Sequence, residues 1–461
     1  MPRSHRVTAI LSLFAAALIS ALLLVVAAQK VSAQSRQISF IRDTEIEDII
    51  RELARPIFIA AHLDPNAVNV YLVQDRSLNA FVAGGQNLFL NTGLLARVDS
   101  PETLLGVVAH EAGHIAGGHL AQRKIAVEDA GTANLIAYAV GILGAIASGR
   151  GEVASAVISG SSDLTLRNLL SYSRSNEQAA DQAAVQYLHE SGISPEGLLD
   201  FMSQLKGQEV LLARNQDPYL STHPLTRERI TFLENQVAQS PFRDKTSITP
   251  TDRARFERAR AKVIGFLESP NMVARTYADS DQSVPARYAR VLLAYRLGHL
   301  EDALRGLDSL LAEVPNDPFF LELKGQMLFE RGHVAESLDP LQRAVTALPQ
   351  ATQIRQLLAR AQIEQNSPEL DRKAVANLEK VLARDPTNAF AWRLIATPYN
   401  RLGKTDMVHL ALSEYWLARG DNERAGIEAR RAMDLMPAGS PDAQQAQDVY
   451  NEAERRLRAA R

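Results

Sequence analysis

Residues 104–114 read Leu-Leu-Gly-Val-Val-Ala-His-Glu-Ala-Gly-His and end an apolar run with a His-Glu-x-x-His motif. On a helix, His110 and His114 lie one turn apart on the same face, so both imidazoles can bind one metal ion. Glu111 then lies beside the open coordination position, where a carboxylate can accept a proton from bound water. Two exposed histidines on a solvated face would fit poorly with the apolar residues before them. The stretch therefore predicts a buried helix that carries a metal site.

The composition limits what the chain can be. At 461 residues it is longer than one hydrophobic core usually serves, so we expect about two or three domains. A formal net charge of -3 gives no support to nucleic-acid binding, which requires a clearly basic surface. The chain contains no Cys, which excludes disulfides, a Cys nucleophile and thiolate ligands to a metal.

The first residues have the pattern of an export signal. A basic start at residues 1–6 precedes an apolar run at 7–28, and Val31-Ser32-Ala33 places small residues where signal peptidase requires them. The pattern predicts cleavage after Ala33 and a secreted or periplasmic protein. The alternative is an uncleaved inner-membrane anchor, because the run is about long enough to span a bilayer. Either way the catalytic part would face the periplasm.

The residues between this leader and the motif predict one helix and a small sheet. Apolar residues at helical intervals begin at Ile46, and Pro56 should limit this helix. Segments rich in β-branched and aromatic residues predict strands at 68–73, 79–83 and 87–91. Gly84-Gly85 would join the last two strands as a hairpin.

The motif helix needs a third ligand, and the ligand's identity decides the class of site. Ser100 as N-cap and Pro101 at the first helical position predict a helix from there to about Leu120. A metzincin would need a third His six positions after His114, where this chain has Leu120. His119 is one residue short, and on a continuing helix it would point about 100° away. The metzincin class is therefore excluded, and a carboxylate from a later helix is the other standard solution.

Glu177 is the best candidate for that carboxylate. Asp181 follows one turn later, and the alanines around the two would let two helices approach closely. Asp181 could then accept the free N–H of a liganding His and fix its tautomer. Spacing alone leaves a second interpretation open, because acidic residues four positions apart commonly form a solvated face.

An insertion between about residues 121 and 172 has a different character. Ala133 to Ala147 is apolar on every face except at Asn134. As a helix it would reach about 22 Å, which is short of a bilayer core of about 30 Å. It is therefore expected either as a buried helix over the active site or as a surface in peripheral contact with a membrane or with unfolded substrate.

The C-terminal part of the chain repeats. Gly298 and Gly332 are 34 residues apart, as are Pro315 and Pro349, and Asn366 takes the Gly position of a third unit. This period is typical of tetratricopeptide repeats, which stack into an α-solenoid with a concave face for peptides or partner proteins. The fold class we expect is α+β, mostly α. The expected regions are a leader at 1–33, a metal-dependent catalytic domain at 34–240, a linker at 241–285 and a tetratricopeptide-repeat domain at 286–461.

Several motifs together resemble one family. His-Glu-Ala-Gly-His at 110–114 is followed at 177–181 by Glu-x-x-Ala-Asp, which resembles the HtpX and CAAX prenyl-protease family of zinc metallopeptidases. Further segments similar to that family are Asn79-Ala80-Phe81, Gly84-Gly85, Gly93-Leu94-Leu95, Ser221-Thr222-His223-Pro224, Arg227 and Arg229. The order of leader, peptidase domain and repeats resembles the soluble periplasmic branch that assists β-barrel assembly. That branch commonly carries cysteines near the C-terminus, and without them any redox control is absent.

The resemblance implies a role for each motif residue. His110, His114 and Glu177 would bind one Zn2+ ion, and Glu111 would be the general base and acid. Asp181 would hydrogen-bond a metal ligand from outside the coordination sphere. His223 would either stabilise the oxyanion or occupy the open metal position. The strand Phe81-Val82-Ala83 would pair with an extended substrate.

The implied function is a periplasmic zinc metalloendopeptidase in quality control of outer-membrane protein assembly. Its substrates would be misfolded or stalled proteins, and its repeats would recruit these substrates or the outer-membrane assembly machinery. A chaperone or scaffold in which the repeats dominate and proteolysis is latent is the alternative.

Overall fold

The computed structural model describes residues 39–119, 172–211, 219, 222–243 and 245–459. The expected leader at 1–33 and the apolar segment at 133–147 lie outside these ranges. Within the described ranges, no helix combines the length and the apolar character needed to cross a bilayer.

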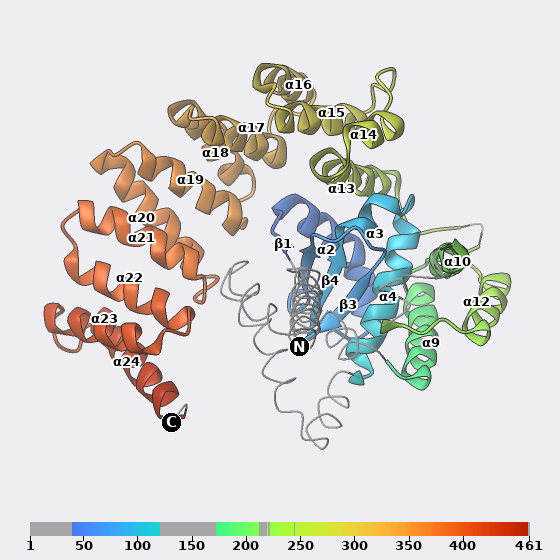
Figure 1. Cartoon of the computed structure of the whole chain (residues 1–461), viewed down its shortest axis with the longest axis horizontal. Helices are drawn as coiled ribbons and strands as arrows, with labels where there is room; N and C mark the ends of the chain where they lie inside the picture. The colour runs from blue at the N-terminus through green and yellow to red at the C-terminus, as the bar shows by residue number, and fades with distance from the viewer. Residues whose placement is uncertain (1–38, 120–171, 212–218, 220–221, 244, 460–461) are drawn as a thin grey trace, which may run out of the picture.

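A four-stranded sheet lies at the centre of the part of the chain before the repeats (Figure 1). Its strands are β1 (Phe40–Ile41), β2 (Asn69–Val73), β3 (Ala80–Ala83) and β4 (Asn87–Asn91), in the order β1-β2-β4-β3. The expected hairpin is confirmed, because β3 and β4 pair antiparallel across Gly84 and Gly85, which have φ values of 57° and 98°. β2 runs parallel to β4. Strand β3 therefore forms one edge of the sheet.

The helices around this sheet are α2 (Thr44–Ala60), α3 (Thr92–Arg97), α4 (Pro101–Ala116), α9 (Arg174–Glu190), α10 (Glu196–Leu211) and α12 (Arg227–Gln239). The expected limit of the first helix was wrong, because α2 continues through Pro56 to Ala60. Pro56 lies on the exposed face of α2, where water can satisfy the carbonyl that proline leaves without a donor. Beyond it, Ile57 and Phe58 are buried in the core.

Helix α4 begins as expected and ends earlier than expected. The Ser100 side chain accepts a hydrogen bond from the Thr103 N–H, and Pro101 is the first helical residue. The helix ends at Ala116 rather than near Leu120, because Gly117 and Gly118 follow and Gly118 has a φ of 62°. The helix therefore ends two residues after the motif.

Two glycines of α4 let other helices approach its backbone. A Cβ on Gly106 would lie 2.6 Å from the backbone nitrogen of Leu198 in α10, and a Cβ on Gly113 would lie 3.0 Å from the carbonyl oxygen of Ala180 in α9. Helix α4 is consequently buried on nearly every side. This packing brings the face of α9 that carries Glu177 against the motif.

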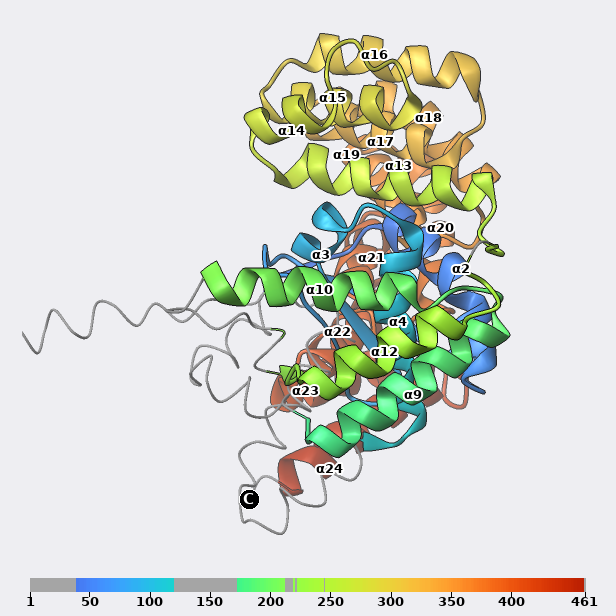
Figure 2. The ribbon, with the colours of Figure 1, turned by 90° about the vertical axis from the view of Figure 1, so that its right-hand side faces the viewer.

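The region at 241–285 contains two helices, α13 (Pro250–Leu267) and α14 (Pro270–Thr276). Helix α13 packs against α2 and α3 on one side and against the first repeat helix on the other (Figure 2). The domain limits themselves stay a prediction.

A buried ion cluster joins α2, α13 and the repeats. Glu45, in the first turn of α2, is fully buried. It pairs with Arg258 of α13, accepts a hydrogen bond from Tyr288 Oη at 2.8 Å, and lies 3.1 Å from Lys262 Nζ. Arg258 also lies 2.5 Å from Asp317, the N-cap of a repeat helix. The repeats are therefore joined through this cluster to α2, which packs against α4.

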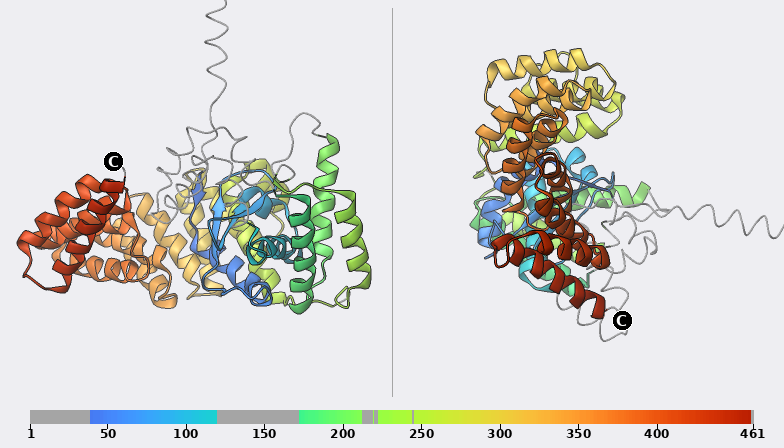
Figure 3. Two further views of the ribbon diagram at one scale, coloured as in Figure 1. Left: turned by 90° about the horizontal axis from the view of Figure 1, so that it is seen from below. Right: turned by 90° about the vertical axis from the view of Figure 1, so that its left-hand side faces the viewer.

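The repeat helices are α15 (Val284–Arg296), α16 (Leu300–Glu313), α17 (Pro318–Glu330), α18 (Val334–Ala347), α19 (Thr352–Glu364), α20 (Pro368–Leu382), α21 (Ala389–Arg401), α22 (Thr405–Ala418), α23 (Asn422–Leu435) and α24 (Pro441–Ala459). Gly298, Gly332 and Asn366 all have positive φ at the turns within units, as the 34-residue spacing predicts. The helices follow an arc that ends across the sheet from α9, α10 and α12 (Figures 1 and 3). The expected fold class, α+β and mostly α with a helical-repeat part, is confirmed.

Candidate metal centre

Four side chains from three segments converge at the end of α4. They are His110 and His114 of α4, Glu177 of α9, and His223, which precedes α12. One possible ligand atom from each lies within 4.8 Å of all the others, and all four residues have an exposed fraction of 0%. The structure thus brings together the three expected ligands and the loop histidine.

The ligand nitrogens of the motif face each other and the carboxylate. His110 Nε2 and His114 Nε2 are 3.1 Å apart. Glu177 places Oε2 3.4 Å from His110 Nε2 and Oε1 3.3 Å from His114 Nε2. Imidazole nitrogens and one carboxylate oxygen are a donor set that zinc prefers. The residues present therefore fit a zinc ion.

Asp181 lies behind His110, on the side away from this cluster. Its Oδ1 is 2.9 Å from His110 Nδ1, so the carboxylate can hold this imidazole in the tautomer that points Nε2 at the metal. Burial opposes the charge on Asp181, but its hydrogen bonds to Arg229 and His110 outweigh burial and lower its pKa. Asp181 is therefore an anion in the folded protein.

Arg229 of α12 is the neighbour that the sequence did not assign to a role. It is 2% exposed, with Nε 2.6 Å from Asp181 Oδ2, Nη2 2.9 Å from Asp181 Oδ1 and Nη1 2.6 Å from Glu177 Oε2. In the sequence, Arg229 was noted only as part of a segment similar to the metallopeptidase family. It balances two buried carboxylates, and each of them contacts a motif histidine.

The two motif histidines differ in electrostatics. Burial lowers the pKa of His114 well below its usual value. Burial also disfavours a charge on His110, but the hydrogen-bonded carboxylates of Asp181 and Glu177 outweigh it and raise the pKa of His110 to about 9. Burial would raise the pKa of Glu177, but His223 and the motif histidines hold it well below the usual range. The carboxylate is therefore ionised and ready to bind a cation.

Glu111 is placed to exchange a proton. It is fully buried, and neither carboxylate oxygen has a hydrogen-bond partner within the described part of the chain. Burial raises its pKa. A buried carboxylate without a partner is costly, and a water molecule beside the metal would supply one.

His223 reaches the cluster from a short segment before α12. Its backbone N–H donates to Tyr219 O at 2.7 Å, and its ring stacks on Tyr219 with centroids 4.4 Å apart. Its Nδ1 lies 3.0 Å from Glu177 Oε1 and its Nε2 lies 3.5 Å from Glu111 Oε1. It therefore lies between the expected base and an expected ligand.

His119 is a second residue whose place the sequence did not reveal. It does not belong to the four-residue cluster. Its Nδ1 lies 2.9 Å from His114 Nδ1, on the outer side of that ring. The expectation that it points away assumed a continuing helix, and the turn at Gly117-Gly118 removes that assumption. A glycine pair directly after the motif was the available signal.

The expected substrate strand is β3, next to α4. Ala80 and Val82 point into the core, while Phe81 stacks on Phe89 on the opposite face with centroids 4.8 Å apart. The outer edge of β3 pairs with no other strand among the described residues. The segment Phe81-Val82-Ala83 thus lies at a sheet edge beside the motif helix.

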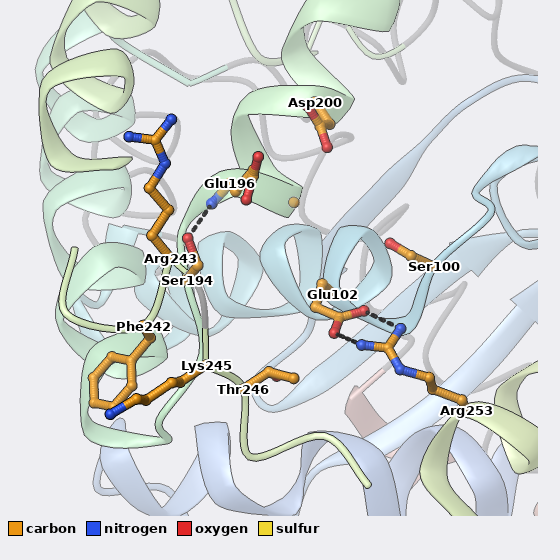
Figure 4. A pocket seen from close by; sticks show the side chains of 11 residues that line it. Ser100, Glu102, Ser194, Glu196, Asp200, Phe242, Arg243, Lys245, Thr246 and Arg253 are labelled. Atoms are coloured by element: carbon orange, nitrogen blue, oxygen red, sulfur yellow. Dashed lines mark hydrogen bonds and ion pairs between the residues drawn. The ribbon is translucent and has the colours of Figure 1, made fainter. Parts of the chain in front are cut away.

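A polar cavity of about 380 Å³ lies elsewhere in this domain (Figure 4). The starts of α4 and α10 line it together with Phe242, Arg243, Lys245 and Thr246. A Glu102–Arg253 ion pair crosses one side. None of the metal-centre residues borders this cavity. It is therefore a separate feature of the surface.

Comparison with known proteins identifies similar sequences. Residues 41–237 match Peptidase family M48. The chain is 26% identical over 395 residues to the beta-barrel assembly-enhancing protease of Escherichia coli K12, covering 84% of this chain and 78% of that protein. It is 27% identical over 292 residues to a putative beta-barrel assembly-enhancing protease of Vibrio cholerae, covering 61% of this chain and 58% of that protein. It is 26% identical over 176 residues to metalloprotease YcaL of Escherichia coli K12, covering 38% and 63%.

Among solved structures, a tetratricopeptide repeat protein from Parabacteroides merdae covers 55% of this chain and 98% of its own, with 12% identity and a TM-score of 0.28. The repeat assignment here rests on the period and turns of the chain itself.

Proposed function

We propose that this chain, whose residues 41–237 match Peptidase family M48, is a zinc metalloendopeptidase that hydrolyses peptide bonds of misfolded or stalled proteins during outer-membrane protein assembly. The observation that carries this proposal is the position of Glu111. Its carboxylate, which accepts no hydrogen bond from the described residues, is buried beside four potential ligands whose ligand atoms lie within 4.8 Å of one another. That arrangement suits water activation at a metal.

The chemistry divides between the ion and the side chains. When bound, zinc supplies Lewis-acid polarisation of the peptide carbonyl and lowers the pKa of the attacking water. His110, His114 and Glu177 would hold the ion. Glu111 would accept the proton of water as the water oxygen attacks the carbonyl carbon. It would then donate this proton to the leaving nitrogen as the C–N bond breaks.

Substrate binding is proposed at the edge of the sheet. The outer edge of β3 pairs with no other strand in the described part of the chain. An extended peptide can add to such an edge through backbone hydrogen bonds, and Phe81, Val82 and Ala83 would supply the pairing atoms. Because β3 packs beside α4, a strand added there would run past the motif helix. This supports endopeptidase rather than terminal cleavage, since no chain end is required.

His223 is proposed to act as a latch. It lies within the ligand cluster and also faces Glu111, so it can occupy the position that water and substrate need. The complete burial of the cluster supports a resting state in which this access is closed. Contact with the developing oxyanion is the other role that its place in the cluster allows.

Partners and location are also proposed. Several relatives are named beta-barrel assembly-enhancing proteases, and the N-terminal pattern predicts export. The arc of repeats offers a surface for unfolded proteins or for the outer-membrane assembly machinery. We propose a periplasmic enzyme whose repeats recruit its substrates.

The test is cleavage of an unfolded protein by the purified full chain. Cleavage that stops on zinc chelation and returns on zinc addition is the expected result, and cleavage unaffected by chelation would overturn the proposal. A chaperone or scaffold role is the second candidate, and the complete burial of the metal centre favours it. Full complementation of a deletion strain by Glu111→Gln would support that role.

A further inference from the structure

We infer that His119 is a positioning residue that fixes His114 in the tautomer presenting Nε2 to the metal. This inference rests on the proposed metal site. The two Nδ1 atoms are 2.9 Å apart, which is hydrogen-bond distance. The other ring nitrogen of His114, Nε2, faces His110 and Glu177 inside the cluster. The two ring nitrogens of His114 therefore have separate partners.

One proton must lie between the two Nδ1 atoms. If His114 uses the lone pair of Nε2 for the metal, its proton resides on Nδ1. That N–H can donate only to an acceptor, so His119 must be neutral with its own proton on Nε2. A metal ligand whose outer nitrogen is hydrogen-bonded is held in tautomer and in ring orientation. His119 would do for His114 what Asp181 does for His110.

The turn after α4 places His119 for this contact. Gly118 has a φ of 62°, which a residue with a side chain rarely adopts. A Cβ on Gly117 would lie 2.6 Å from His119 Nε2 and 2.9 Å from its Cε1, so the ring occupies space that only glycine leaves free. The two successive glycines thus allow the imidazole of His119 to contact that of His114.

A third ring fixes the plane of the His114 imidazole. Tyr172 stacks on His114 with centroids 3.7 Å apart and planes 17° apart, and its backbone N–H donates to Thr222 O at 2.9 Å. His119 is only 8% exposed, so little water competes for the contact. The imidazole of His114 is consequently held on its face and at its outer edge.

A neutral acceptor suits this position. Asp181, Glu177 and Glu111 already place three carboxyl groups around the motif, and Arg229 is the buried cation that pairs with Asp181 and Glu177. A further carboxylate behind His114 would add buried negative charge without a partner, which is costly. Imidazole supplies the acceptor without that charge.

The test measures zinc affinity of the full chain by competition with a chelator, together with thermal unfolding of the metal-free protein. His119→Ala should weaken zinc binding by about 10–100-fold while the metal-free unfolding temperature stays unchanged. His119→Asn, whose Oδ1 can accept the same hydrogen bond, should recover most of the loss. His189→Ala is the matched control, because His189 lies in α9 and bonds Ser240.

Two results would overturn the inference while leaving the proposed function standing. Wild-type zinc affinity in His119→Ala would show that the contact does not support the ligand. An affinity loss that Asn does not rescue and that follows a lower unfolding temperature would assign His119 to packing alone. If the wild-type chain itself bound no zinc, the proposed function would fail, and the inference with it.

Discussion

Arg229 and Asp181 form a two-pronged ion pair behind the metal centre, with Nε 2.6 Å from Oδ2 and Nη2 2.9 Å from Oδ1. The same guanidinium reaches Glu177, and Asp181 in turn contacts His110. The pair therefore links α12 to the ligands on α9 and α4. Its importance for stability and for the metal can be separated by experiment.

Replacing Arg229 should destabilise the metal-free protein. Arg229→Met keeps most of the side-chain volume but leaves Asp181 and Glu177 buried without a cation, which typically costs about 3–5 kcal/mol. Urea unfolding of the metal-free chain measures this cost. Arg227→Met, at an exposed position two residues earlier in α12, should change the stability little. Equal stability of the two variants would contradict the role given to Arg229.

Two glycine-to-alanine substitutions should change the free energy of unfolding in opposite directions. Gly106→Ala would place its Cβ 2.6 Å from backbone of α10, and such overpacking costs about 1–3 kcal/mol. Gly426→Ala meets nothing closer than 3.9 Å in helix α23 and should gain about 0.4–1 kcal/mol from the unfolded state. Chemical unfolding of both variants checks the prediction. A neutral Gly106→Ala would mean that α4 and α10 do not approach this closely.

Glu322 of α17 should make stability depend on pH. Burial raises its pKa to about 8, and the nearby Lys262 offsets this only in part. The folded chain then keeps a proton that the unfolded chain loses above its ordinary pKa of 4.5. The contribution of Glu322 to stability therefore falls as pH rises from about 4.5 to 8, by up to about 1.4 kcal/mol per pH unit.

The comparison that isolates this effect is Glu322→Gln against wild type. Glutamine resembles the protonated acid, so the variant should gain stability relative to wild type as pH rises towards 8, and the difference should level off above that. Glu301→Gln, at a site that is 93% exposed, is the control. A pH-independent difference between Glu322→Gln and wild type would contradict the raised pKa.

Removing the proposed latch should speed cleavage. His223→Ala frees the position between Glu111 and Glu177. A tenfold faster rate would mean that the closed state is favoured by about 1.4 kcal/mol in the wild-type chain. Initial rates on an unfolded protein, at equal zinc content, measure this. A slower variant would assign His223 to the transition state instead. An unchanged rate would contradict both roles.

Local sequence signals predicted those features that a few neighbouring residues determine. Ser100 and Pro101 fixed the start of α4 because capping involves only the first turn. The positive φ at Gly298, Gly332 and Asn366 follows from the repeat spacing in the same way. Glu177 and Asp181 share one face of α9, as their four-residue spacing predicts, and the structure shows that this face is buried.

Features that depend on distant residues were not predictable in this way. Arg229 meets Asp181 across 48 residues of sequence, and no local pattern indicates that contact. The continuation of α2 through Pro56 depends on which face of the helix is exposed. The contact of His119 with His114 depends on a left-handed turn that ends α4 four residues early. For Arg229 and Pro56, tertiary packing decided among conformations that the local sequence allows, whereas for His119 the pair Gly117-Gly118 was the available local signal.

The most direct measurement is cleavage of an unfolded protein by the zinc-loaded Glu111→Gln chain. The variant should keep its zinc content and its unfolding temperature, because Gln fills the same space and Glu111 is not an expected ligand. Its rate should fall by about 100-fold or more, since the proton acceptor is lost. Cleavage at the wild-type rate would contradict the assignment of Glu111, and with it the proposed mechanism.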